Sequence, residues 1–212
     1  VYTCYGFFSK AWKESAAKIL KEDNKVKYYN SIYRDVKNFL KAIVIGLIAI
    51  MPFAFPLLVD SSYSDAYAYI PILAISIYYT NMSNFFGGIF GAYKDTKIMG
   101  STTIVAAIMN IVINLIFIPK FGIWAAVFST LISNIVIYWY RRQKLKIYIK
   151  LKGKFNYAFW LLLGLTLFTY YKNNMAINIV MFIIVLAYCI FTNKNFINQI
   201  LSPITKRLKK SK

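Results

Sequence analysis

The sequence contains no histidine and only two cysteines, which lie 185 positions apart. Without histidine the chain has no imidazole for acid–base catalysis or metal ligation. Two cysteines so far apart exclude a disulfide scaffold and a cysteine-type zinc site. No Walker A loop, dinucleotide fingerprint, HExxH or catalytic-triad motif occurs. We therefore expect no cofactor, no metal, no ATP binding and no enzymatic activity.

Charged residues are also scarce, at 16% of the 212 positions, whereas hydrophobic residues make up 59%. A soluble domain has about 45–50% apolar and about 25% charged residues. A bilayer-spanning helix needs roughly 20 mostly apolar residues. Six segments meet or nearly meet this requirement: Phe39–Val59, Tyr69–Ala92, Ile98–Ile118, Gly122–Tyr140, Phe155–Tyr171 and Met175–Thr192. The composition predicts an all-α fold, a multi-pass transmembrane helical bundle in contact with the lipid bilayer.

The basic residues alternate between the predicted loops. Of the 26 Lys and Arg residues, all but Lys120 and Lys172 lie before or at the start of the first span, in the third and fifth loops, or in the tail. Positively charged loops stay on the cytoplasmic side. We therefore expect both visible ends in the cytoplasm of a bacterial cell. The net charge of +19 then reflects topology and anionic lipid rather than nucleic-acid binding.

These assignments divide the chain into five parts. Residues 1–38 contain the end of a preceding span and an amphipathic segment, with Trp12 and Ala16 on its apolar side, that we expect on the inner leaflet. Residues 39–140 form four spans, 141–154 a basic cytoplasmic loop, 155–192 two further spans, and 193–212 a basic tail with a second amphipathic stripe. Because the chain starts within an apolar run, we expect it to be the C-terminal piece of a longer protein.

The predicted spans contain no Asp, Glu or Arg, and their polar side chains are mostly amides and hydroxyls. Asn81 and Asn84 are three residues apart and Asn110 and Asn114 are four apart, so each pair shares one helix face. Such a face suits a water-filled cavity for polar cargo, and it equally suits hydrogen bonding between helices. These four asparagines are the candidate cavity residues, and both interpretations stay open.

Several prolines and glycines are candidates for bends or close helix contacts. Pro52 and Pro56 each remove a helix hydrogen bond in the first span. Gly87 and Gly91 form a G-x-x-x-G spacing that permits close helix packing or a flexible bend. Pro119 and Gly122 predict the end of one span and a sharp reversal into the next.

The stretch from Tyr63 to Ala126 resembles the C-terminal part of the polysaccharide (O-antigen type) flippases, which belong to the MATE-like superfamily of exporters. The resemblance rests on Lys94-x-Thr96-Lys97 in a short inner loop and on the ordered series that follows it. That series is Asn110-x-x-x-Asn114-x-x-x-x-Pro119-x-x-Gly122-x-x-Ala125-Ala126, with the basic pair Arg141-Arg142 after the next span.

The resemblance implies the second lobe of a two-lobe transporter plus two C-terminal spans, with the N-terminal lobe of the same protein outside this chain. It implies that the whole protein moves undecaprenyl-pyrophosphate-linked oligosaccharides across the cytoplasmic membrane for surface polysaccharide synthesis. One feature departs from it: pyrophosphate recognition favours Arg or Lys, and the spans offer only Lys41 at an edge. A drug or cation exporter of the same superfamily, and a membrane-embedded polymerase or glycosyltransferase, are the alternatives.

Overall fold

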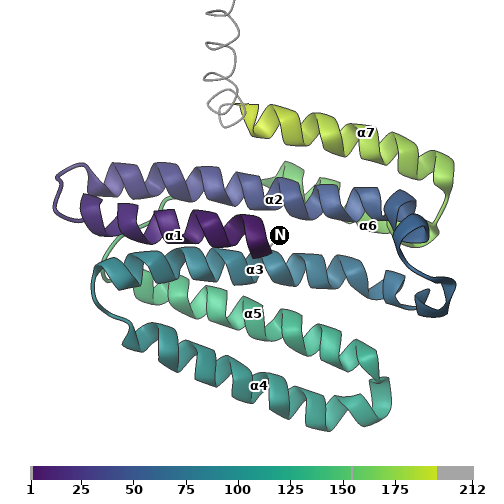
Figure 1. Cartoon of the computed structure of the whole chain (residues 1–212), viewed down its shortest axis with the longest axis horizontal. Helices are drawn as coiled ribbons and strands as arrows, with labels where there is room; N and C mark the ends of the chain where they lie inside the picture. Colours follow the sequence, from purple (N-terminus) through teal and green to yellow (C-terminus); the bar gives the residue numbers. More distant parts are fainter. Residues whose placement is uncertain (1, 154, 195–212) are drawn as a thin grey trace, which may run out of the picture. The chain divides into compact units, whose positions relative to one another are not determined.

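The computed structural model describes residues 2–153 and 155–194, and the described chain is all helix and turn (Figure 1). The elements in order are α1 Tyr2–Ile19, α2 Lys25–Leu58, the 3-10 helix η1 Ser61–Tyr63, α3 Ala66–Ala92, α4 Lys97–Phe121, α5 Ile123–Leu145, α6 Tyr157–Lys172 and α7 Met175–Thr192. The predicted all-α class is confirmed. The amphipathic stripe predicted in the tail, from Ile197 to Leu208, lies outside the described residues.

Each of the six predicted spans coincides with a helix, and four of these helices are long and apolar enough to cross a bilayer: α2, α4, α5 and α7. The other two helices, α3 and α6, do not meet this criterion, and the reason is different for each. α3 contains many tyrosine, asparagine and serine residues. α6 has 16 residues, which at 1.5 Å per residue span about 24 Å of a roughly 30 Å hydrocarbon core. The chain is thus a multi-pass helical membrane protein by length and composition, and six spans stay a prediction.

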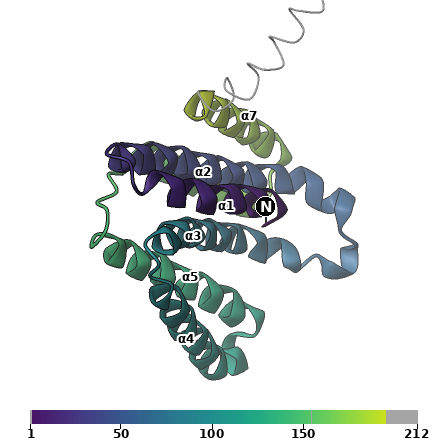
Figure 2. The ribbon, with the colours of Figure 1, turned by 60° about the vertical axis from the view of Figure 1, so that its left-hand side comes forward.

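The chain divides into two units by its internal contacts. The first contains α1, residues 25–34 of α2, and α3, α4 and α5. Within this unit α5 lies between α3 and α4, as Figures 1 and 2 show from two directions. α3 has many buried residues, whereas α4 buries only Thr102 and Ala106. The rest of α4 presents apolar side chains such as Leu115, which is 74% exposed, as expected of a helix that faces lipid.

The amphipathic segment around Trp12, which we predicted on the inner leaflet, packs its apolar side against other helices. In the structure its apolar side is covered by protein: Trp12 is 3% exposed and stacks on Phe85 of α3, with ring centroids 4.5 Å apart. The Trp12 indole N–H donates to the Phe85 carbonyl oxygen at 2.9 Å, and the Tyr29 hydroxyl donates to the Ala16 carbonyl oxygen at 2.7 Å. The apolar stripe is therefore a packing face of α1, because it meets aromatic side chains of α3 and the start of α2.

The predicted basic loop 141–154 is partly helix, since α5 continues to Leu145. The segment that follows α5 is tied to the α3–α4 connection by Tyr148, whose hydroxyl donates to Asp95 Oδ2 at 2.6 Å. This hydrogen bond raises the pKa of Tyr148, because losing the proton would place a phenolate beside the carboxylate. The backbone N–H of Lys152 donates to Asn30 Oδ1 at 2.6 Å, which fixes the same segment to α2.

The second unit consists of residues 35–57 of α2 with α6 and α7. Asn156 and Asn174 cap its two C-terminal helices, because their side-chain oxygens accept from Phe159 N and Ile177 N. Lys41, predicted to reach the membrane surface, is 5% exposed, and its ammonium lies 4.3 Å from the centroid of the Phe159 ring. A cation loses hydration when it is buried, and its attraction to the face of an aromatic ring compensates for part of that loss.

The predicted bend residues have distinct surroundings. Pro52 and Pro56 both lie inside α2, whose helix continues to Leu58. Pro119 lies in the last turn of α4, which ends three residues after the predicted span Ile98–Ile118, and Gly122 makes the reversal with φ +55° and ψ −134°. A Cβ atom on Gly87 would lie 2.8 Å from Met99 Cε, whereas beside Gly91 there is open space.

Gly88 provides the closest approach in the first unit, because a Cβ atom there would overlap Trp12 Nε1. We expect Gly88→Ala to displace the indole, break its hydrogen bond to Phe85, and lower stability by about 1–3 kcal/mol. Gly91→Ala, on the same helix with open space around it, is the matched control and should be neutral or slightly stabilising. Thermal unfolding in detergent, followed by circular dichroism, measures both. Equal melting temperatures for the two variants would contradict the packing of α1 on α3.

Candidate functional site

α5 turns a series of polar residues toward its neighbours, at positions 129, 133, 134 and 141. Ser129, Ser133 and Arg141 are 0%, 5% and 4% exposed, and Asn134 is half-buried. Residues four apart lie on one face of a helix, so this series forms a stripe about 18 Å long. Because α5 lies between α3 and α4, the stripe brings polar groups of all three helices together. We call this set of residues the polar core.

Asn110 and Asn114 of α4 form a closed network with Ser129 at one end of the polar core. Asn114 Nδ2 donates to Asn110 Oδ1 at 3.0 Å, and Asn110 Nδ2 donates to Ser129 Oγ at 3.2 Å. Ser129 Oγ in turn lies 2.7 Å from Asn114 Oδ1. The predicted asparagine pair therefore does share a face, and that face meets α5. Both amides are half-buried, which leaves them accessible from one side.

The other two predicted asparagines lie on α3. Asn81 is fully buried and Asn84 is half-buried. One turn earlier on α3, Ser76 accepts a hydrogen bond of 2.7 Å from Asn134 Nδ2 of α5. The structure thus places Asn81 and Asn84 on a different helix from the Asn110–Asn114 pair, with α5 between them. Their role in lining a cavity stays a prediction.

Arg141 closes the other end of the polar core, where α5 ends and α4 begins. Its Nε donates to Thr102 Oγ1 at 2.9 Å and its Nη2 donates to Thr103 Oγ1 at 3.0 Å. The same side chain donates to the carbonyl oxygens of Ser83, at 3.2 Å, and Met99, at 3.1 Å. One guanidinium thereby links α5 to both α3 and α4. No Asp or Glu occurs in these three helices, so backbone and hydroxyl oxygens satisfy this charge.

The two threonines are oriented to receive the guanidinium. Thr102 Oγ1 donates to the Ile98 carbonyl oxygen at 2.7 Å, and Thr103 Oγ1 donates to the Met99 carbonyl oxygen at 2.8 Å. With its proton turned back onto the helix, each hydroxyl presents lone pairs to Arg141. The C-terminal end of α5 also favours a cation through the helix dipole. The threonine oxygens and the C-terminal end of α5 together therefore stabilise a charge that an apolar lipid environment alone would exclude.

The sequence prediction placed Arg141 in a loop, and this was wrong. The Arg141-Arg142 pair matched the basic start of a cytoplasmic loop, so the span was ended at Tyr140. Two signals point to the observed position. Arg141 lies eight residues after Ser133 and twelve after Ser129, at multiples of their four-residue spacing, and the second turn of α4 carries a pair of threonines that can accept its hydrogen bonds.

The chemistry available in the polar core is that of amides, hydroxyls and one buried guanidinium. Ser83 Oγ and Ser133 Oγ are buried without a hydrogen-bond partner among the described residues. In the same part of the chain, no three His, Cys, Asp or Glu side chains are grouped to hold a metal ion. The core therefore offers donors and acceptors for neutral polar groups, whereas its guanidinium is already bonded to protein oxygens.

Comparison of the chain with protein-family models, with curated proteins and with solved structures found no match. Fold and site therefore define a class of protein: an all-α, multi-pass membrane protein in which one central helix holds its neighbours through a polar core.

Arg141 and Arg142 provide a matched pair of neighbouring cations. Arg142 is half-buried, and its Nη1 lies 3.4 Å from the Tyr138 hydroxyl. We expect Arg141→Lys to keep the charge but lose the bonds that reach two helices at once, destabilising the protein by about 1–3 kcal/mol. Arg142→Lys should change stability by less than about 0.5 kcal/mol. Equilibrium unfolding in mixed detergent micelles compares the two variants. Equal losses of unfolding free energy would contradict the role of Arg141 in linking α5 to α3 and α4.

Proposed function

We propose that this chain is part of a transporter that moves lipid-linked oligosaccharide units across the bacterial cytoplasmic membrane for surface polysaccharide synthesis. The cargo in this proposal is an oligosaccharide on undecaprenyl pyrophosphate. An N-terminal lobe of the same protein would form the second wall of the transport cavity. The resemblance of the Asn110–Ala126 series to polysaccharide flippases first suggested this function. The polar core is the observation that supports it best.

A lipid-linked oligosaccharide presents two kinds of polar group. Its sugars carry hydroxyls, which pair with amide and hydroxyl side chains of the kind found at Asn110, Asn114 and Ser129. Its pyrophosphate is anionic and favours a guanidinium or ammonium group. Apart from Lys41, the cation of the helical bundle that bears on this proposal is Arg141, which is 4% exposed and donates to Thr102, Thr103 and two carbonyl oxygens. The pyrophosphate would therefore need a rearrangement of Arg141, or a cation from the other lobe.

Two other features of the chain disfavour the two alternatives. A drug or cation exporter would place a carboxylate in its cavity, and α3 to α7 contain no Asp or Glu within their helices. A polymerase or glycosyltransferase would need large outer loops to hold its reacting groups. The connections predicted to face outward are short: residues 59–65 with η1, Gly122 alone, and Asn173 with Asn174.

The first test deletes the gene for the full-length protein in its host. We expect lipid-linked oligosaccharide to accumulate on the cytoplasmic side, and surface polysaccharide to be lost. Sensitivity to cationic dyes is measured in parallel and should not change. Unchanged sugar lipids together with new dye sensitivity would support the drug-exporter alternative instead.

The second test separates contact with cargo from helix packing. We expect Asn110→Ala combined with Asn114→Ala to abolish export in the full-length protein while membrane insertion persists. Ser129→Ala is the control, because it removes the fully buried partner of both amides and leaves the amides in place. It should retain most export. Normal export by the double variant would remove both asparagines from the mechanism, and equal loss in both variants would assign them to packing.

A further inference from the structure

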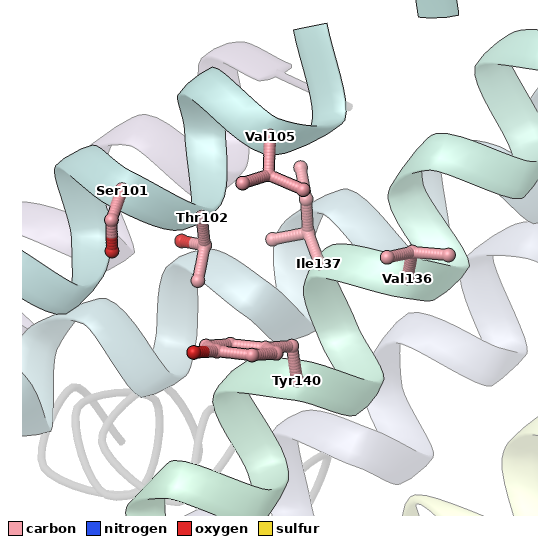
Figure 3. Close-up of a pocket in the computed structure, with 6 residues that line it drawn as sticks. All are labelled: Ser101, Thr102, Val105, Val136, Ile137 and Tyr140. Atoms are coloured by element: carbon pink, nitrogen blue, oxygen red, sulfur yellow. The ribbon is translucent and has the colours of Figure 1, made fainter. Parts of the chain in front are cut away.

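A hollow of about 100 Å³ lies between the first turns of α4 and the last turns of α5. It is lined by Ser101, Thr102, Val105, Val136, Ile137 and Tyr140, and we call it the α4–α5 groove. Figure 3 shows the hydroxyl oxygens of Ser101 and Tyr140 toward one end of the groove, with Val136 toward the other. The groove is therefore amphipathic along its length, with hydroxyl groups at one end and aliphatic side chains at the other.

Positive charge surrounds the hydroxyl end. Lys144 Nζ lies 5.6 Å from the centroid of the Tyr140 ring. Lys97 precedes Ser101 by one helical turn and is exposed, and Arg141 donates to Thr102 from behind the groove wall. The nearest acidic residue in sequence, Asp95, accepts the hydrogen bond of Tyr148. A ligand at this end therefore meets cations and hydroxyl donors, which favours an anionic head.

The other end of the groove favours a hydrocarbon chain. Val105 is 53% exposed, and Val136 and Ile137 are half-buried on the facing helix. Both helices are long and apolar enough to cross a bilayer, so we expect these side chains at the level of acyl chains. A soluble phosphate would gain nothing from this end, whereas a lipid would place its head among the cations and its chain along the valines.

We propose that the α4–α5 groove binds an anionic glycerophospholipid of the inner leaflet. Its phosphate would lie at the Ser101, Tyr140 and Lys144 end, and one acyl chain would follow Val105, Val136 and Ile137. The hollow accommodates only part of a lipid, so the rest stays in the bilayer. Basic pockets between helices on the cytoplasmic side bind anionic headgroups in this way. This inference goes beyond the proposed transport function, because it holds whatever cargo the protein moves.

Photo-crosslinking of the full chain in phosphatidylcholine vesicles tests the groove. The probe is phosphatidylglycerol with a diazirine on one acyl chain, and mass spectrometry locates the labelled residues. We expect labelling to concentrate on peptides that contain Val105, Val136 and Ile137. Lys144→Gln should lower this labelling about fivefold, since one lysine near the surface contributes about 1 kcal/mol of attraction to anionic lipid. Lys144→Arg should restore it.

Lys172→Gln is the control, because Lys172 ends α6 at the opposite, sparsely charged side of the predicted topology. It should leave labelling of the groove unchanged, and circular dichroism checks that each variant stays helical. Equal labelling by the matching phosphatidylcholine probe would overturn the proposal, since it would mean ordinary bilayer contact. Displacement of the probe by undecaprenyl pyrophosphate at lower concentrations than by phosphatidylglycerol would also overturn it, and would assign the groove to transport cargo.

Discussion

A polar group inside a bilayer has no water to bond to, so it must find its partner in the protein. The first unit meets this constraint at three places on α5, which bonds to α4 at Ser129, to α3 at Asn134 and to both helices at Arg141. Among the described residues, the buried hydroxyls of Ser83 and Ser133 have no such partner. Apolar packing alone gives little specificity between helices in lipid, because the surrounding acyl chains are equally apolar. The hydrogen bonds of α5 therefore determine which helices associate and in which register. They also explain how a buried guanidinium persists without a carboxylate in the three helices that surround it.

The same arrangement determines what the unit can bind. Hydrogen bonds hold α5 against α3 and α4, whereas most of α4 remains uncovered and apolar. In the proposed function, polar cargo would meet amides and hydroxyls along α4 and α5. Lipid can be met by the outer side of the same helices, where the α4–α5 groove opens. One pair of helices thus presents two surfaces of different chemistry, and Arg141 lies beside the groove through its bond to Thr102.

Periodicity and local chemistry were sufficient to predict the helices, the reversal at Gly122, and the common face of Asn110 and Asn114. These features depend on residues close in sequence. The surroundings of Trp12, Arg141 and the glycines depend on residues distant in sequence, which local patterns do not predict. The stripe around Trp12 fits lipid and protein equally well until the aromatic rings of α3 are placed beside it. Arg141 is typical of a loop until Thr102 and Thr103 are known to face it. Likewise, spacing favoured close contacts at Gly87 and Gly91, whereas the structure places close neighbours at Gly87 and Gly88 and open space at Gly91.

The most direct test of this account is a measurement of membrane topology with single cysteines. Ser62 lies in η1 and Lys146 directly follows α5, and both positions are exposed. The two variants are Ser62→Cys and Lys146→Cys. Each is placed in a chain whose Cys4 and Cys189 have been changed to serine. The account predicts that a membrane-impermeant maleimide labels position 62 in intact cells and position 146 only after permeabilisation. Labelling of both positions from the same side would contradict it.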